Sequence, residues 1–205
     1  MKTRLQKTLT ALLLLFVIKA THAQTNTWQW AKSAGATGNE ATTGSVVDAS
    51  GNVYVVGWYT SATITFGTIT LTNPGNFTAD MFVAKYDASG NVLWAKTFGG
   101  VDGEIGNGIA IDASGTIYVT GWFTSSAMAM DTYTITNAGT ASSDMFVAKL
   151  YANGNTLWAK SGGGTGGDRG LGVAVDASNN VFVSGGFNSN SISFGSGGLT
   201  NAGTN

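Results

Sequence analysis

The fold is decided by the stretch Asp48-Ala-Ser-Gly-Asn-Val-Tyr-Val-Val-Gly-Trp58, which returns at a fixed distance along the chain. It recurs as Asp112-Ala-Ser-Gly-Thr-Ile-Tyr-Val-Thr-Gly-Trp122 and, less closely, as Asp176-Ala-Ser-Asn-Asn-Val-Phe-Val-Ser-Gly-Gly186. Both offsets are 64 residues, and 31 of 64 positions are identical in an ungapped alignment of the first unit on the second. Self-similarity at a fixed period indicates a repeat architecture. The predicted units are 33–96, 97–160 and an incomplete 161–205.

Within one unit the apolar residues alternate with period two, as in half-buried β-strands, and Gly or Asn stands where hairpin turns need a positive φ. The Thr/Ser-rich stretches 61–79 and 125–143 are predicted to form an extra hairpin or a decorated loop. No helix is predicted after residue 23. Four strands are predicted in the second unit, within Ile109–Ile111, Ile117–Trp122, Met145–Lys149 and Thr156–Lys160.

Four antiparallel strands per tandem unit are typical of a β-propeller blade. The predicted fold class is therefore all-β, a β-propeller of four-stranded antiparallel blades with about three blades of an incomplete ring. An open β-repeat stack or solenoid is the alternative. Residues 28–32 carry the Trp-Ala-Lys pattern of a fourth strand, and we expect them to be an outer strand that closes the ring. Because the third unit stops before its own Asp-Met-Phe-Val-Ala-Lys, we expect the chain to be the front of a longer protein.

These motifs resemble the SBBP-type bacterial β-propeller repeat, a family of secreted or surface proteins. The resemblance rests on the recurring turn-and-strand stretch quoted above, on Asp80-Met-Phe-Val-Ala-Lys85 and on Trp94-Ala-Lys96, all in fixed register, and it covers about residues 28–205. It implies a propeller scaffold outside the cell. The third unit departs from the pattern at Gly186, where the other units have Trp, and at Asn179, which replaces the turn Gly.

The N-terminus has the composition of an export signal. A basic segment precedes the apolar stretch Leu9–Ile18, which is too short to span a bilayer, and small residues lead to Ala23. We predict a signal peptide at 1–23 cleaved after Ala23, a secreted or extracytoplasmic location, and no membrane insertion of the mature chain. A retained signal anchor is the alternative.

Composition excludes several classes of function. The chain has no Cys, and its single histidine, His22, lies within the predicted signal peptide. Disulfide scaffolds, thiol nucleophiles, Cys/His zinc sites and histidine catalysis are therefore excluded from the mature protein. The remaining six basic and 11 acidic residues give a net charge of −5, which does not suit nucleic-acid binding.

The candidate ligand-binding residues are three acids at one repeat position, Glu40, Glu104 and Asp168, and two tryptophans at another, Trp58 and Trp122. In a ring the acids would form a circle of carboxylates that binds a cation, a basic partner or sugar hydroxyls. The favoured interpretation is that each accepts hydrogen bonds from loop amides and locks neighbouring blades. The tryptophans are candidates for stacking on sugar rings, although large aromatic residues at a fixed blade position more often fill the core between blades.

Two further patterns have simple structural interpretations. The repeated Asp-Ala-Ser-Gly-Asn resembles part of a calcium loop, but it lacks the closing acid and is interpreted as a hairpin turn that Asp caps. No cofactor is predicted apart from calcium at this place as the alternative. Most basic residues of the mature chain follow Trp-Ala or Val-Ala in the repeat: Lys32, Lys96, Lys160, Lys85 and Lys149. Asp80 and Asp144 start the adjacent strand, and cross-strand Asp–Lys pairing is the simplest account of these charges.

The predicted function is an exported, non-catalytic scaffold or recognition module that binds an extracellular protein or glycan at the bacterial cell surface. The stretches 61–79 and 125–143 differ between units while the strands repeat, as expected when loops carry specificity. The alternatives are an extracellular carbohydrate-active enzyme on a propeller frame and a purely structural adhesion repeat. Because the repeated acids are equivalent, no acid and base are distinguished, and an enzyme is not favoured.

Overall fold

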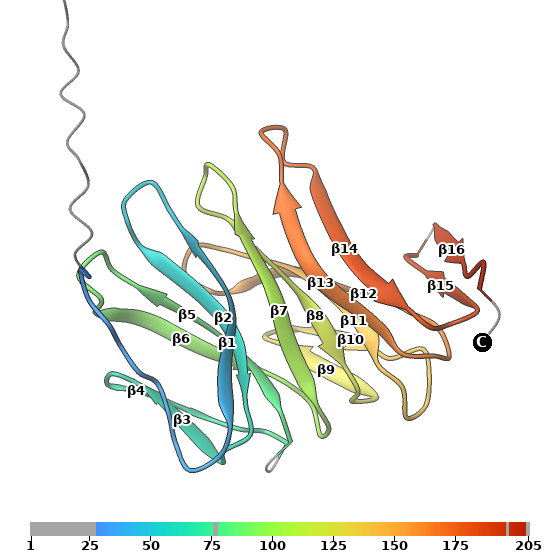
Figure 1. Cartoon of the computed structure of the whole chain (residues 1–205), viewed down its shortest axis with the longest axis horizontal. Helices are drawn as coiled ribbons and strands as arrows, with labels where there is room; N and C mark the ends of the chain where they lie inside the picture. The colour runs from blue at the N-terminus through green and yellow to red at the C-terminus, as the bar shows by residue number, and fades with distance from the viewer. Residues whose placement is uncertain (1–27, 76–77, 196, 204–205) are drawn as a thin grey trace, which may run out of the picture.

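The computed structural model describes residues 28–75, 78–195 and 197–203, so the predicted signal peptide lies outside the described residues. All of the regular elements in this part of the chain are β-strands (Figure 1). In chain order they are β1 (Glu40–Val47), β2 (Val53–Tyr59), β3 (Thr63–Phe66), β4 (Ile69–Thr72), β5 (Asp80–Tyr86), β6 (Val92–Phe98), β7 (Glu104–Ile111), β8 (Ile117–Phe123), β9 (Ala127–Met130), β10 (Tyr133–Thr136), β11 (Asp144–Leu150), β12 (Thr156–Gly162), β13 (Asp168–Val175), β14 (Val181–Phe187), β15 (Ser191–Ser193) and β16 (Gly198–Thr200).

The strands form two complete four-stranded antiparallel sheets and half of a third. Blade 1 has the order β1-β2-β5-β6, blade 2 has the order β7-β8-β11-β12, and half-blade 3 is the pair β13-β14. Each unit adds a two-stranded hairpin between its second and third strand positions: β3-β4, β9-β10 and β15-β16. The predicted all-β fold with four-stranded antiparallel blades is confirmed, and the stretches 61–79 and 125–143 contain hairpins. The outer strands β6 and β12 run two residues past the predicted unit boundaries.

The innermost strands β1, β7 and β13 pack side by side, as Figure 1 shows. Each is interrupted by a β-bulge whose extra residue is Thr43, Asn107 or Leu171. The Thr43 hydroxyl donates to the carbonyl of Gly106, and the Asn107 amide donates to the carbonyl of Gly170 at 2.7 Å. The bulges of β1 and β7 therefore direct a polar side chain at the next blade, which a regular strand would not do.

The largest apolar core lies in the seam between blades 1 and 2. Blade 1 contributes Val56 and Val83 to it, and blade 2 contributes Val119 and Phe146, all buried. Full burial of each such side chain is worth about 1.5–3 kcal/mol. Since side chains alternate along a strand, one face of a blade fills one seam and the other face fills the next. Each blade therefore buries the apolar face of its neighbour, as expected for stacked repeats.

Residues 28–32 are not a strand in the described chain, and their predicted role in closing a ring stays a prediction. Residues 28–34 have no strand assignment, and the only backbone pairing nearby is an isolated bridge from Gly35 to Thr65. A strand needs a hydrogen-bonded neighbour along its length, and this segment has none among the described residues. Its side-chain contact nevertheless follows the repeat: the Trp30 indole N–H donates to the Ala88 carbonyl at 3.1 Å, as Trp94 donates to Ala152 one period later.

Candidate functional site

The three repeated Asp residues cap their own turns. Asp48 Oδ1 accepts hydrogen bonds from the backbone N–H groups of Ser50 and Asn52, both at 2.9 Å, and Oδ2 accepts from the Asn52 amide and the Tyr54 hydroxyl. Burial raises the pKa of Asp48, but these hydrogen bonds outweigh it and the net pKa is lowered. Gly51 has the positive φ, 80°, that the turn requires. This geometry is that of the predicted hairpin turn, and the carboxylate oxygens are already used within it.

The candidate acids begin the innermost strands and face the seams between blades. Glu104 and Asp168 have no exposed surface, whereas Glu40, which faces no earlier blade in the described chain, is half-buried. Each acid accepts a loop amide: Ala36 N–H donates to Glu40 at 3.4 Å, Gly100 N–H to Glu104 at 2.9 Å and Gly164 N–H to Asp168 at 2.9 Å. The structure therefore shows the amide-accepting arrangement and not an open circle of solvent-facing carboxylates. Ligand binding by these acids stays a prediction.

A second acid from the preceding blade lies beside each buried one. Asp80 of β5 hydrogen-bonds with Glu104 across the seam, and the two carboxyls are both buried. Burial raises the pKa of Glu104 to about 8; a hydrogen bond with Ser125 opposes the shift and the Asp80 carboxyl adds to it. Burial also raises the pKa of Asp80. Two buried carboxyls in contact cannot both stay ionised without a counter-charge, so near neutral pH this pair holds a proton between them.

The same arrangement recurs in the next seam with a different balance of donors. Burial raises the pKa of Asp144, and the charge of Asp168 adds to the shift. Asp168 also accepts hydrogen bonds from the backbone N–H of Asn188 and from both the backbone N–H and the hydroxyl of Ser189. A buried acid of one blade beside a buried acid of the next is therefore a repeated feature that sequence reasoning missed. The signal was available, because Asp80 and Glu104 each have an acidic counterpart one period later.

The repeated Gly-Gly after each outer strand makes room for these acids. A Cβ on Gly99 would lie 2.0 Å from Asp80 Oδ1, and one on Gly163 would lie 2.2 Å from Asp144 Oδ1. Neither separation is compatible with any side chain. The carboxyls lie against the Cα atoms of these glycines, so the packing of the blades requires glycine at both positions.

The candidate tryptophans are half-buried strand residues. The Arg169 guanidinium of β13 lies 4.9 Å from the centre of the Trp122 ring, so this indole face is covered by the next blade. Trp58 pairs in register with Ala41 and Met81 on its neighbouring strands. Stacking on sugar rings by either tryptophan stays a prediction.

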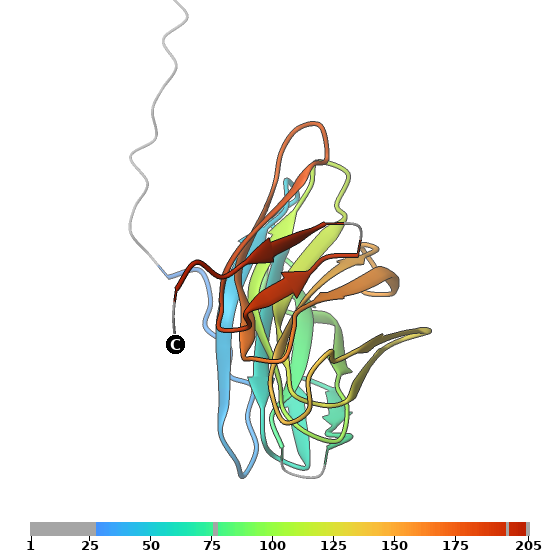
Figure 2. The same cartoon turned by 90° about the vertical axis from the view of Figure 1, so that its right-hand side faces the viewer.

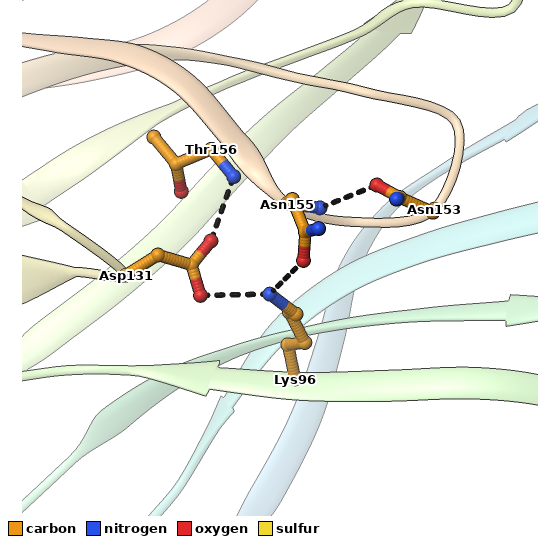
Figure 3. Close-up of polar contacts among 5 residues, drawn as sticks. All are labelled: Lys96, Asp131, Asn153, Asn155 and Thr156. Carbon is orange, nitrogen blue, oxygen red and sulfur yellow. Dashed lines mark hydrogen bonds and ion pairs between the residues drawn. The ribbon is translucent and has the colours of Figure 1, made fainter.

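A polar clamp joins the outer edge of blade 1 to two turns of blade 2 (Figure 3). The Lys96 ammonium lies 2.7 Å from Asp131 Oδ1, at the tip of the β9-β10 hairpin, and 2.7 Å from Asn155 Oδ1. Asp131 Oδ2 accepts the backbone N–H of Thr156 at 2.7 Å, which fixes the carboxylate. Asp131 has a positive φ of 53°, and Gly67 and Gly195 occupy the equivalent turns of the other units. The β9-β10 hairpin thus contributes to the seam as well as to the outer surface.

The predicted cross-strand pairing of Asp80 with a lysine of the adjacent strand is wrong. On β6, Lys96 lies opposite Val83, and its ammonium pairs with Asp131 of blade 2 instead. The Lys85 ammonium lies 4.8 Å from the centre of the Tyr54 ring, while Asp80 faces Glu104 of the next blade. The antiparallel register therefore gives Asp80 no lysine opposite it.

Two absences can be stated for the described residues. Within 28–75, 78–195 and 197–203, His, Cys, Asp and Glu side chains nowhere gather in threes or more in a way that would hold a metal ion. Within the same ranges no helix is long and apolar enough to cross a membrane.

Comparison with known proteins gives one informative relative. No protein-family model matches the chain. An uncharacterized WD repeat-containing protein of Acanthamoeba polyphaga mimivirus is 30% identical over 163 residues, which cover 72% of this chain. The chain spans only 11% of the length of that relative. The fold is that of a β-propeller-type repeat protein. The narrower SBBP-type assignment stays a prediction.

The outer faces of the hairpins of this propeller-type chain are exposed. Thr63 and Thr72 form an exposed cross-strand pair on β3-β4, and Thr65 and Thr70 form the next one, with their hydroxyls 3.1 Å apart. The equivalent face of β9-β10 has Ala and Thr, and that of β15-β16 has Ser, Thr and Gly. The inner faces are apolar, and those of β3-β4 and β9-β10 are mostly buried. Sequence, not shape, distinguishes these faces from one unit to the next.

Proposed function

We propose that the chain is an exported, non-catalytic repeat scaffold that binds a protein or glycan partner at the cell surface. A WD repeat-containing relative supports a repeat scaffold or protein-interaction module. The predicted signal peptide supports export, and the resemblance to a family of secreted repeats supports a bacterial cell surface.

The observation that carries the proposal is that each hairpin has one face toward the core and one face toward solvent. On β3-β4, Ile64, Phe66 and Leu71 face the core, while the threonines between them face solvent. The polar side chains of the turns, the acid pairs and the clamp already interact with other groups of the protein itself. What remains accessible and differs from unit to unit is the hydroxyl-rich outer faces, as expected when a fixed scaffold presents variable contacts.

The disposition of the acids also supports a scaffold over a hydrolase. Glycoside hydrolysis uses an acid and a base or nucleophile that are about 5–10 Å apart and reach the substrate. Asp80 and Glu104 hydrogen-bond with each other and are fully buried. The same pair recurs in the next seam, as a structural element would.

The test is a binding screen with matched surface variants. The chain recovered from the culture medium, expected to begin at Gln24, is applied to arrays of polysaccharides and of surface proteins. A double variant with Thr65→Lys and Thr70→Lys places two charges on the β3-β4 outer face, and we expect it to lose binding at least about tenfold. A control double variant, Ser50→Lys and Ser89→Lys, places the same charges on exposed turns at the other end of blade 1. Equal binding by both variants, or no partner in the screen, contradicts the proposal.

A further inference from the structure

The clamp at Lys96 has a counterpart one period earlier that lacks the acid. In the clamp, the Asp131 carboxylate joins the Lys96 ammonium to the backbone N–H of Thr156, with both contacts at 2.7 Å. The residues 64 positions earlier are Lys32, Gly67 and Val92. The first unit therefore retains the lysine and the backbone N–H, and has a glycine in place of the carboxylate between them.

The segment that carries Lys32 is fixed against blade 1 by contacts on both sides of the lysine. Before it, the Trp30 indole N–H donates to the Ala88 carbonyl at 3.1 Å, a contact that recurs one period later at the same distance. After it, Gly35 forms a bridge to Thr65 of β3, and this bridge recurs one period later as well. The backbone on either side of Lys32 therefore contacts blade 1 as the clamp lysine's backbone contacts blade 2.

The turn of β3-β4 has the backbone conformation of the turn that presents Asp131. Both hairpins close with a two-residue turn, and φ is 59° at Gly67 and 53° at Asp131. A side chain at position 67 would therefore leave the backbone in the direction that the Asp131 side chain takes. In Figure 2, where half-blade 3 is nearest the viewer, blade 1 with this hairpin lies behind blade 2.

A cavity of about 280 Å³ lies where the carboxylate would be. Its lining includes Lys32, Gly67 and Val92, with Tyr86 and Asn91 beside them. The Lys32 ammonium has neither an ion pair nor a hydrogen bond within the described residues. The Asn91 amide donates to a carboxylate of its own turn at 2.8 Å. Because all the clamp residues have described counterparts here, the cavity results from one side chain, that of position 67.

We infer that this cavity binds the carboxylate of an aspartate or glutamate side chain from a partner polypeptide. One oxygen of that carboxylate contacts the Lys32 ammonium and the other accepts the Val92 N–H, as the two oxygens of Asp131 do in the clamp. Hydrogen bonds of this charged kind are shorter and stronger than neutral ones. A polypeptide is favoured over other anions because the equivalent place in the next seam is filled by the side chain of a turn residue.

The inference specifies the protein class of partner within the proposed function and rests on that proposal to this extent. The cavity lies at the turn of β3-β4, at the end of the outer face that carries the proposed function, so one partner can contact both. Its test uses a small probe and different residues. Failure of the partner screen and failure of carboxylate binding are therefore separate results.

The probe is N-acetyl-aspartate amide, which has a single carboxylate, and its neutral control is N-acetyl-asparagine amide. Each is titrated into the chain at neutral pH and constant ionic strength, and the Val92 amide signal is followed by two-dimensional NMR. We expect a saturable shift with a Kd in the millimolar range, because one partly exposed charge contact is weak. The neutral control should cause no shift. Lys32→Met should weaken probe binding at least about tenfold, whereas Lys96→Met, in the clamp, should leave it unchanged.

Two reciprocal variants test the geometry of the cavity. Gly67→Asp supplies the absent carboxylate within the chain, so the Val92 signal should no longer respond to the probe. Asp131→Gly empties the equivalent place in the clamp, so the Thr156 amide signal should begin to respond, with a similar Kd. The first variant closes a site and the second opens one, and neither change touches the core.

Several outcomes overturn the inference. They are an unresponsive Val92 signal, a response that survives Lys32→Met or Gly67→Asp, and an equal response to sulfate at the same ionic strength. A Thr156 signal that stays unresponsive in Asp131→Gly does so too. Tighter, Lys32-dependent binding of methyl galacturonide than of the aspartate probe would identify a uronic acid as the ligand and would overturn the assignment to a polypeptide.

Discussion

The seam between blades 1 and 2 and the seam between blade 2 and half-blade 3 contain the same kind of acid pair, held in different ways. In the first, Glu104 accepts a hydrogen bond from Gly100 and contacts Asp80, and its Oε1 is buried without a partner among the described residues. In the second, the shorter Asp168 accepts four hydrogen bonds from Gly164, Asn188 and Ser189. One repeat position thus supports a proton-sharing pair in one seam and a carboxylate held by donors in the next.

The largest effect is expected from filling the space in which the first pair lies. Gly99→Ala puts a Cβ 2.0 Å from the buried Asp80 Oδ1, and should lower the free energy of unfolding by about 3 kcal/mol or more. Gly35→Ala is the matched control one period earlier. There the added Cβ meets only the half-buried Glu40 carboxyl at 3.0 Å, and the loss should stay below about 1 kcal/mol. Chemical denaturation measures both, and equal losses would show that the acid pair does not set the requirement for glycine.

The next largest effect is the pH dependence of stability, which distinguishes Glu104 in the first seam from Asp168 in the second. The folded-state pKa of Glu104, about 8, is above its ordinary value of 4.5, so the folded chain retains a proton that the unfolded chain releases. The resulting stabilisation is complete below about pH 4.5 and is lost as the pH rises through about 8. We expect the thermal midpoint to fall by roughly 4–8 °C between pH 5 and pH 8.5, corresponding to about 2 kcal/mol for a chain of this size.

Glu104→Gln removes the titrating proton and should flatten this profile, with a midpoint above that of the unaltered chain at pH 8.5. Asp168→Asn is the control for the other seam. It replaces a carboxylate that accepts four hydrogen bonds, and should cost about 1–2 kcal/mol at both pH values. A steep profile that persists in Glu104→Gln would assign the pH dependence to another group.

The smallest effect concerns the clamp at the outer edge of the first seam. Lys96→Met removes a partly exposed ion pair and should cost about 1 kcal/mol or less. Asp131→Gly loses the same pair but relieves the positive φ of 53°, so we expect a change near zero. Asp131→Ala loses the pair and keeps the strain, and should be the least stable of the three. A different order, measured by urea denaturation, would mean that the clamp contributes more than its exposure implies.

Much of this architecture could be predicted from particular residues. The fixed offset between Asp48 and Asp112 revealed the repeat, alternation along strands such as 144–150 revealed the sheets, and the turn chemistry of Gly51 and Gly115 placed the hairpins. These signals are local, since each depends on the conformation that a few neighbouring residues prefer. The acid pairs were not predicted because their members come from different blades, 24 residues apart in sequence.

The predicted cross-strand pairing of Asp80 with a lysine failed for a related reason. Strand register and blade packing decide which charges meet: Asp80 faces another acid, while Lys96 of the adjacent strand pairs with Asp131 of the next blade. The closing strand expected at 28–32 stays a prediction, because a strand forms only beside a partner.

The sequence alone determined the repeat, the class of its strands and the residues of its turns, because these follow from periodicity and from backbone preferences that act over a few residues. Only the tertiary structure decided which acids meet, which indoles are covered and which apolar residues stay exposed. Val119 and Val183 have the same side chain at the same repeat position, yet one is buried and the other is not. The physical reason is that a side chain is buried only when a second surface covers it, and the sequence of one repeat specifies only the first of these two surfaces.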